Sequence, residues 1–215
     1  MKNKIIKAIE DEKLIVIVRS VEKEKLIPLA EAMYEGGVRL LEITYDAKSI
    51  VSDEETAENI KMLATHFESR MYIGAGTVLK ESQAELTKNA GGTFIISPDT
   101  NPDVIKKTVE LGPVSIPGAL TPSEIQRAHI SGADFVKLFP ITSMGVKYVK
   151  AVAAPLSHVK LLAVGGVGLD NIPDYLKSGV SGFGLGSNII DKNALADGDY
   201  KTITELAKQY TMAVK

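Results

Sequence analysis

The sequence predicts an α/β protein built as a (β/α)8 TIM barrel with an extra N-terminal helix. A short apolar run, a turn and an amphipathic segment recur eight times along the 215 residues. Strands and helices that alternate at this spacing predict a parallel sheet, and eight units in about 200 residues reach the lower size limit of a closed barrel. The apolar runs are nearly continuous, as in strands that are buried on both sides. We expect a single barrel domain over residues 1–215.

The expected elements follow one another in a regular order. An amphipathic helix over 2–10 comes first, and later helices begin at Ser52, which has Glu55 three residues on, and at Thr121-Pro122-Ser123-Glu124. The expected strands are 14–18, 39–44, 71–75, 93–96, a short one within 113–117, 134–138, 159–163 and 181–185. The expected helices between and after them are 22–35, 53–67, 82–89, 101–111, one that begins at 121, 144–152, 170–177 and a C-terminal region that ends near 213.

An open, doubly wound sheet is the main alternative to the barrel. Such a sheet usually carries a glycine fingerprint directly after its first strand. Here the first strand is followed by Arg19-Ser20-Val21. The missing glycines favour the closed barrel.

The composition excludes several classes of function. Hydrophobic residues make up 45% and charged residues 24%, as in ordinary globular proteins. The net charge of -2 argues against nucleic acid as a partner, because such proteins carry a basic excess. The chain has no cysteine and no His or carboxylate cluster with the spacing of a metal site. No apolar run is long enough to span a membrane. We therefore expect a soluble cytoplasmic protein without metal or cofactor.

One predicted strand contains a charge that its neighbours do not explain. Lys137 lies in the apolar run Asp134-Phe135-Val136-Lys137-Leu138, which ends before Phe139-Pro140. Burial of an unpaired amine is costly and lowers its pKa, which leaves a free amine near neutral pH. Schiff-base chemistry on a carbonyl substrate requires such an amine. The alternative is that Lys137 is the last strand residue and extends its ammonium group into solvent.

Glu42 repeats this pattern in the second strand, within Leu41-Glu42-Ile43-Thr44. Buried ionisable groups are rarely left unpaired. Strands two and six are both even-numbered, and inward residues of alternate strands share a layer of the barrel. Glu42 and Lys137 are therefore expected to face each other across the barrel mouth. They would supply a proton shuttle and a nucleophile, and a plain buried ion pair is the alternative.

Further candidates follow because barrel active sites lie at the C-terminal ends of the strands. The loops after strands seven and eight often bind phosphate, and here they contain Gly165-Gly166 and Gly186-Ser187. Glycines let backbone N–H groups approach an anion closely, although barrel loops also need glycines simply to turn. The other strand ends contribute the substrate-binding candidates Arg19, Thr44, Thr77 and Pro98.

Taken together, six motifs resemble those of one family, the 2-keto-3-deoxy-6-phosphogluconate / 4-hydroxy-2-oxoglutarate (KDPG/KHG) aldolases. They occur in the order and spacing of that family and cover nearly the whole chain. The motifs are Leu41-Glu42-Ile43-Thr44, Gly74-Ala75-Gly76-Thr77-Val78-Leu79, Ile96-Ser97-Pro98, Ile116-Pro117-Gly118, Val136-Lys137-Leu138-Phe139-Pro140 and Val164-Gly165-Gly166. The set is specific, whereas any one motif alone is not.

The resemblance implies a metal-free, class I aldolase that is usually a homotrimer. Such an enzyme cleaves a keto-deoxy sugar acid phosphate to pyruvate and an aldehyde such as glyceraldehyde 3-phosphate. It implies that Lys137 forms the Schiff base with pyruvate, that Glu42 is the general acid/base and that Thr77 lies near the pyruvyl end. The residues that it implies for the phosphate are Gly165, Gly166, Gly186 and Ser187.

The chain also departs from the gluconate-type members. These tend to have an arginine, expected to hold the pyruvate carboxylate, where this chain has Asp46. Arg19 is the nearest candidate to replace it. The sister 2-keto-3-deoxy-6-phosphogalactonate aldolases resemble the chain better at Arg19, Val164 and Leu185-Gly186-Ser187, so they remain an alternative. More remote alternatives are a phosphosugar isomerase or epimerase and a non-catalytic sugar-phosphate binder.

Overall fold

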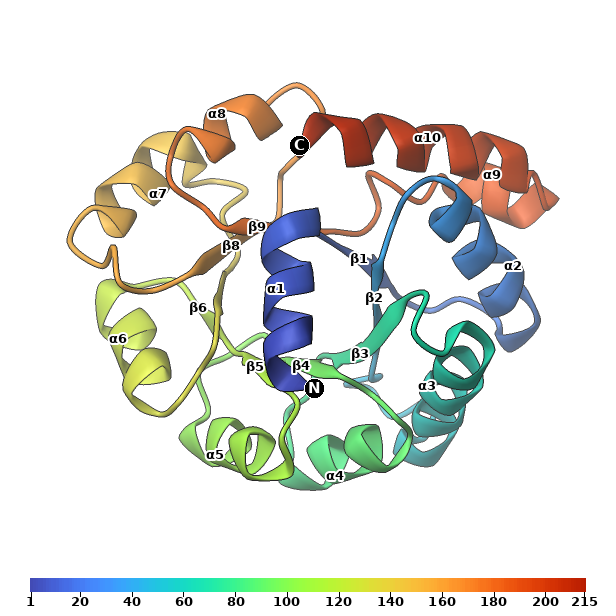
Figure 1. Ribbon diagram of the computed structural model, residues 1–215, viewed down its shortest axis with the longest axis horizontal. Coiled ribbons are helices and arrows are strands. Elements are labelled where there is room, and N and C mark those ends of the chain that lie inside the picture. The colour runs from blue at the N-terminus through green and yellow to red at the C-terminus, as the bar shows by residue number, and fades with distance from the viewer.

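Parallel strands form a ring that is surrounded by helices in the computed structural model, which describes residues 1–215 (Figure 1). The strands are β1 (Leu14–Val18), β2 (Leu40–Thr44), β3 (Tyr72–Gly76), β4 (Phe94–Ile96), β5 (Val114–Ile116), β6 (Gly118–Ala119), β7 (Val136–Leu138), β8 (Leu161–Val164) and β9 (Gly182–Leu185). The helices are α1 (Lys2–Glu12), α2 (Lys23–Glu35), α3 (Asp53–Phe67), α4 (Glu81–Asn89), α5 (Pro102–Leu111), α6 (Pro122–Ile130), α7 (Gly145–Ala153), α8 (Ile172–Leu176), α9 (Lys192–Asp197) and α10 (Tyr200–Ala213).

The sheet closes into a ring because β5 and β6 form one continuous barrel strand. The strand order is β5-β4-β3-β2-β1-β9-β8-β7-β6, and all pairs are parallel. Its first and last members, β5 and β6, are consecutive in the chain and separated only by Pro117. They are two halves of the fifth barrel strand, because β5 pairs with β4 and β6 pairs with β7. The predicted (β/α)8 barrel is confirmed, with a fifth strand that extends past the proline.

Several helix boundaries follow from side chains that cap the backbone. The Ser52 side chain accepts a hydrogen bond from the Glu55 N–H (3.1 Å), and Thr121 and Glu124 form a capping box. The predicted helix over 170–177 is shorter than expected, since α8 covers only Ile172–Leu176. The predicted C-terminal region divides into α9 and α10, because Gly198 ends α9 in a left-handed conformation (φ 72°).

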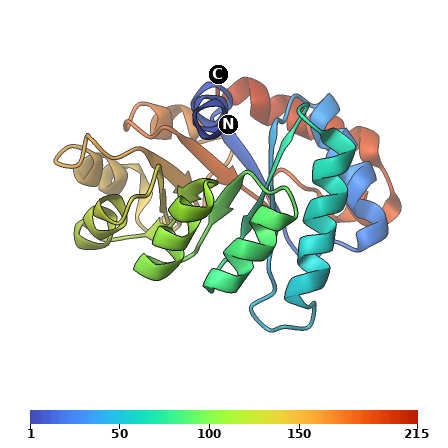
Figure 2. The same ribbon diagram turned by 60° about the horizontal axis from the view of Figure 1, so that its bottom comes forward.

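The first helix lies across one end of the barrel, at the N-terminal ends of the strands (Figures 1 and 2). Its side chains Ile5 and Ile9 are fully buried. They belong to one apolar cluster with residues in or next to the strands, which are Ile15, Leu40, Phe94, Ile96, Val114, Ile116, Phe135 and Leu162. This end is therefore filled and closed, so a substrate can enter only from the opposite end.

Two inward-pointing strand residues lie directly above this apolar layer. Successive side chains of a strand point to opposite faces, so residues two apart share a face. Glu42 follows Leu40 and Lys137 follows Phe135 at that spacing. Both charged side chains therefore point into the barrel at its open end.

Removal of the Ile9 side chain should loosen the closed end of the barrel. We expect Ile9→Ala to lower the free energy of unfolding by about 2–5 kcal/mol, because it leaves a cavity between α1 and the strands. Urea unfolding followed by far-UV circular dichroism measures the loss. Ile6→Ala on the same helix is the control and should cost less, because Ile6 is only partly buried. Equal losses for both variants would contradict this account of α1.

Candidate active site

Lys137 is a buried amine without a carboxylate bound to it. Its side chain is 6% exposed and lies in β7, flanked in the sheet by Gly118 and Leu162. The Nζ atom is 4.8 Å from the centre of the Phe139 ring. Burial lowers the pKa of Lys137, Arg19 lowers it further, and the negative charge of Glu42 opposes the shift. The solvent-exposed alternative for Lys137 is therefore wrong.

Glu42 is buried even more completely, at 1% exposed, in β2. Neither carboxyl oxygen has a hydrogen-bond partner within the chain. Burial raises the pKa of this carboxyl, and the positive charges of Lys137 and Arg19 act in the opposite direction. The two groups affect each other's pKa without forming a direct ion pair. Because neither group is bound by the other, both the amine and the carboxyl remain available to react.

Two glycines of β3 make room for the side chains inside the barrel. A Cβ atom on Gly76 would overlap the carboxyl group of Glu42, and one on Gly74 would overlap the Phe94 ring. Both glycines therefore serve packing inside the barrel. Gly76 in particular allows the Glu42 carboxyl to lie against the β3 backbone.

Arg19 joins two loops at the open end of the barrel. Its Nη2 atom donates a hydrogen bond of 3.4 Å to Thr77 Oγ1. Thr77 has φ 56°, and Ser20, next to Arg19, has φ 53°. Left-handed conformations are uncommon in residues other than glycine and concentrate at functional sites. The guanidinium group is thus held at the mouth by a contact between the β1 and β3 ends.

The Asp46 carboxylate forms hydrogen bonds within its own loop. Its carboxylate accepts hydrogen bonds from the backbone N–H groups of Lys48 (2.9 Å), Ile50 (2.9 Å) and Val51 (3.2 Å). These bonds lower its pKa. Asp46 therefore orders the loop after β2 and contributes no positive charge to the barrel mouth, which leaves Arg19 as the arginine of this region.

The loops after β8 and β9 present free backbone N–H groups. Gly165 and Gly166 have φ values of 96° and 71°, and neither their N–H groups nor that of Ser187 donates a hydrogen bond within the chain. The Asn171 and Asn188 side chains instead bind the carbonyl oxygens of Gly166 (2.9 Å) and Val167 (2.7 Å). The carbonyl groups are thereby satisfied, and the unpaired N–H groups are available to an anion.

A short turn follows β9. The N–H groups of Ile189 and Ile190 both donate to the carbonyl oxygen of Gly186 at 3.1 Å. The N–H of Ser187 therefore belongs to the first, unpaired positions of this turn.

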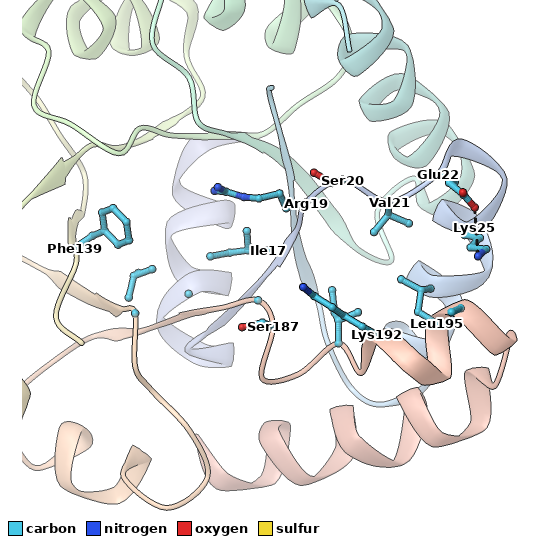
Figure 3. Close-up of a pocket in the computed structure, with 16 residues that line it drawn as sticks. Ile17, Arg19, Ser20, Val21, Glu22, Lys25, Phe139, Ser187, Lys192 and Leu195 are labelled. Atoms are coloured by element: carbon cyan, nitrogen blue, oxygen red, sulfur yellow. Dashed lines mark ion pairs between the residues drawn. The ribbon is translucent and has the colours of Figure 1, made fainter. Parts of the chain in front are cut away.

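A cavity of about 710 Å³ lies between Arg19, Phe139 and the loops after β8 and β9 (Figure 3). Four of the predicted site residues line it: Arg19, Gly165, Gly186 and Ser187. Lys137 is adjacent through Phe139, which is in the cavity wall, and Thr77 is joined to the wall by its bond to Arg19. Neither Lys137 nor Thr77 lines the cavity itself, and the same is true of Glu42, Thr44, Pro98 and Gly166. The roles of these residues stay predictions.

The cavity wall also contains residues that the sequence analysis did not assign to the site. They include Ile17, Ser20, Phe139 and Lys192. The spacing of two residues along a strand would have indicated Ile17, which follows the inward Ile15, and Phe139, which follows Lys137. No pattern in the sequence indicates Lys192, because it lies in the loop-to-helix region after β9.

The structure contains neither a cluster of metal-ligating side chains nor a helix that could span a membrane. No group of three or more His, Cys, Asp or Glu side chains is arranged to hold a metal ion. None of the helices has both the length and the apolar character that crossing a membrane requires.

The sequence and the fold are similar to those of known aldolases. A family model described as "KDPG and KHG aldolase" matches residues 5–206. The 2-dehydro-3-deoxy-phosphogluconate aldolase of Treponema pallidum is 33% identical, over 95% of this chain and 95% of that protein. The probable 2-dehydro-3-deoxy-6-phosphogalactonate aldolase of Rhizobium meliloti is 34% identical, over 89% of this chain and 87% of that protein.

A crystal structure of KDPG aldolase from Legionella pneumophila has the same fold. It superposes with a TM-score of 0.84 at 28% identity and covers 94% of this chain and 96% of that one. That crystal contains pyruvate captured as a covalent carbinolamine intermediate.

The overlap between position 76 and the Glu42 carboxyl can be tested by a double-mutant cycle. We expect Gly76→Ala to lower the free energy of unfolding by about 1–3 kcal/mol, because the added Cβ overpacks the barrel interior. In a Glu42→Ala background the same change should cost clearly less, because the carboxyl group is gone. Urea unfolding of the four proteins measures both costs. An equal cost in both backgrounds would show that the two positions do not compete for space.

Proposed function

The chain belongs to the KDPG and KHG aldolase family, and on this basis we propose that it is a class I, Schiff-base aldolase. Its proposed substrate is 2-keto-3-deoxy-6-phosphogluconate, with 4-hydroxy-2-oxoglutarate as a second substrate. The products are pyruvate and an aldehyde such as glyceraldehyde 3-phosphate. The observation that carries the proposal is the buried amine of Lys137, whose pKa is lowered inside the barrel opposite Glu42. We also propose that the enzyme works as a homotrimer in the cytoplasm.

The Lys137 amine begins the reaction. Its lone pair attacks C2 of the keto acid, and loss of water from the carbinolamine gives an iminium ion. Burial helps because only the neutral amine is a nucleophile, and the lowered pKa increases the fraction of Lys137 in that form. The relative from Legionella pneumophila, in which pyruvate forms a carbinolamine, supports this step.

Glu42 moves the protons. As a carboxylate it takes the proton from the C4 hydroxyl, directly or through a water, and the electrons of the C3–C4 bond pass into the iminium group. The aldehyde leaves and an enamine remains. Protonation of the enamine at C3 and hydrolysis of the resulting iminium release pyruvate and the Lys137 amine. Because its pKa is raised, this carboxyl accepts and holds a proton more readily than an exposed glutamate does.

The proposed binding contacts follow the two ends of the substrate. Arg19 holds the pyruvyl carboxylate near Thr77, a role supported by the engagement of Asp46 with its own loop. The free N–H groups of the loops after β8 and β9 hold the phosphate. The predicted contacts of Thr44 and Pro98 belong to the pyruvyl end. Binding at both ends orients the substrate, which lowers the barrier.

The galactonate substrate is the second candidate. It is favoured by Arg19, Val164 and the Leu185-Gly186-Ser187 sequence, and by relatives named for that activity in Rhizobium meliloti and Escherichia coli. Both substrates require the same lysine chemistry. Measurement of kcat/KM for the two sugar acid phosphates decides between them.

Reduction by borohydride in the presence of pyruvate tests the central assignment. We expect the wild-type chain to gain the mass of one reduced pyruvyl adduct, on a peptide that contains Lys137. Lys137→Ala should not form the adduct and should lose turnover by roughly 10⁴-fold or more. An isomerase, an epimerase or a simple binder would form no adduct. Activity near wild type in Lys137→Ala would overturn the proposal.

The pH dependence of adduct formation tests the pairing of Lys137 with Glu42. The rate should rise with pH as Lys137 loses its proton, with a midpoint below 10.5, because burial lowers its pKa. In Glu42→Gln the midpoint should move to lower pH, since the negative charge that raises the pKa of Lys137 is gone. The same variant should cleave the substrate about 10²–10⁴-fold more slowly. A midpoint that stays in place or rises would show that the two groups are not coupled.

A further inference from the structure

The cavity extends beyond the glycine loops to α9. Lys192, Leu195 and Ala196 line it there. Residues three and four apart on a helix share a face, so one face of α9 forms the outer wall. The N-terminal turn of α9 is fixed by the Asp191 side chain, which accepts hydrogen bonds from the N–H groups of Asn193 and Ala194, both at 2.9 Å. Lys192 is the only charged residue on this wall.

The Lys192 ammonium group points into the cavity and is unpaired. Figure 3 shows its side chain directed toward the space between Arg19 and Ser187. No carboxylate of the chain forms an ion pair with Lys192, in contrast to Lys25, which pairs with Glu22 at 3.3 Å. Glu22 and Lys25 therefore cancel each other in the cavity wall. The net positive charge of the wall comes from Arg19 and Lys192.

The two charges come from different segments of the cavity wall. Arg19 is tied to Thr77 and so belongs to the β1–β3 side. Lys192 lies beyond Ser187, in the segment that follows β9. A phosphate on the N–H groups of Gly165, Gly166 and Ser187 carries about 1.5 to 2 negative charges at neutral pH, and backbone dipoles provide only partial positive charge. These backbone N–H groups alone therefore give the phosphate no contact with a full positive charge.

We propose that Lys192 supplies this cation and determines specificity for substrates with a terminal phosphate. The inference rests on the proposed aldolase function and deepens it. A lysine is suited to the role because its ammonium is a compact charge on a flexible stem that can follow the phosphate. The contact is present in both the bound substrate and the transition state, so it acts on binding and not on bond cleavage.

The test compares Lys192→Met with wild type on two substrates. One is the sugar acid phosphate that the wild type cleaves, and the other is the same keto-deoxy sugar acid without phosphate. We expect KM for the phosphorylated substrate to rise about tenfold or more with kcat unchanged, because an interaction common to ground and transition state is lost. The kcat/KM for the unphosphorylated substrate should not change. Inorganic phosphate, as a competitive inhibitor, should bind the variant more weakly by a similar factor.

Two further variants serve as controls. Lys192→Arg keeps the charge and should restore most of the affinity. Lys201→Met removes the same charge from α10, outside the cavity, and should leave both substrates unaffected if the effect is local. The pyruvate adduct on Lys137 should form in all variants, which shows that the barrel is folded and its amine active.

The outcomes separate this inference from the proposed function. If the wild type forms no adduct on Lys137, the aldolase assignment fails. If the adduct forms but Lys192→Met leaves KM for the phosphorylated substrate unchanged, only the role of Lys192 is overturned. An equal loss on both substrates, or a loss that Lys201→Met reproduces, overturns it as well.

Discussion

The burial of an amine and a carboxyl in one apolar barrel, without a direct bond between them, is the constraint around which this molecule is organised. Lys137 and Glu42 are nearly inaccessible, and the Glu42 oxygens have no partner. Such an arrangement is unfavourable for folding, so the rest of the barrel must stabilise it. In return each group titrates away from its usual range, in the direction that carbonyl chemistry needs.

The closed end of the barrel, at the N-terminal ends of the strands, supplies that stability. The layer of Ile, Leu, Val and Phe side chains beneath the two charged residues, together with α1, closes one end. The same closure makes the other end the single entrance. The same apolar side chains therefore have two effects. They stabilise the closed end, and they leave Lys137 and Glu42 accessible only from the open end.

At the open end of the barrel, backbone N–H groups and charged side chains both line the cavity. Glycine loops after β8 and β9 offer N–H groups whose neighbouring carbonyls are bound by Asn171 and Asn188. Full charges come from Arg19, directly after β1, and from Lys192, at the start of α9. In the proposed mode of binding, Arg19 meets the carboxylate of the substrate and Lys192 meets its phosphate.

Much of this follows from local patterns in the sequence. The repeated apolar runs determined the barrel, and the alternation of strand residues determined that Lys137 and Glu42 point inward, because a strand's two-residue period is set by neighbouring residues alone. Other features required the folded chain: the fifth strand that continues past Pro117, the direction of the Asp46 carboxylate, and the Lys192 ammonium in the cavity. These are relations between residues distant in sequence, and they are fixed only when the ring of strands closes and its loops pack.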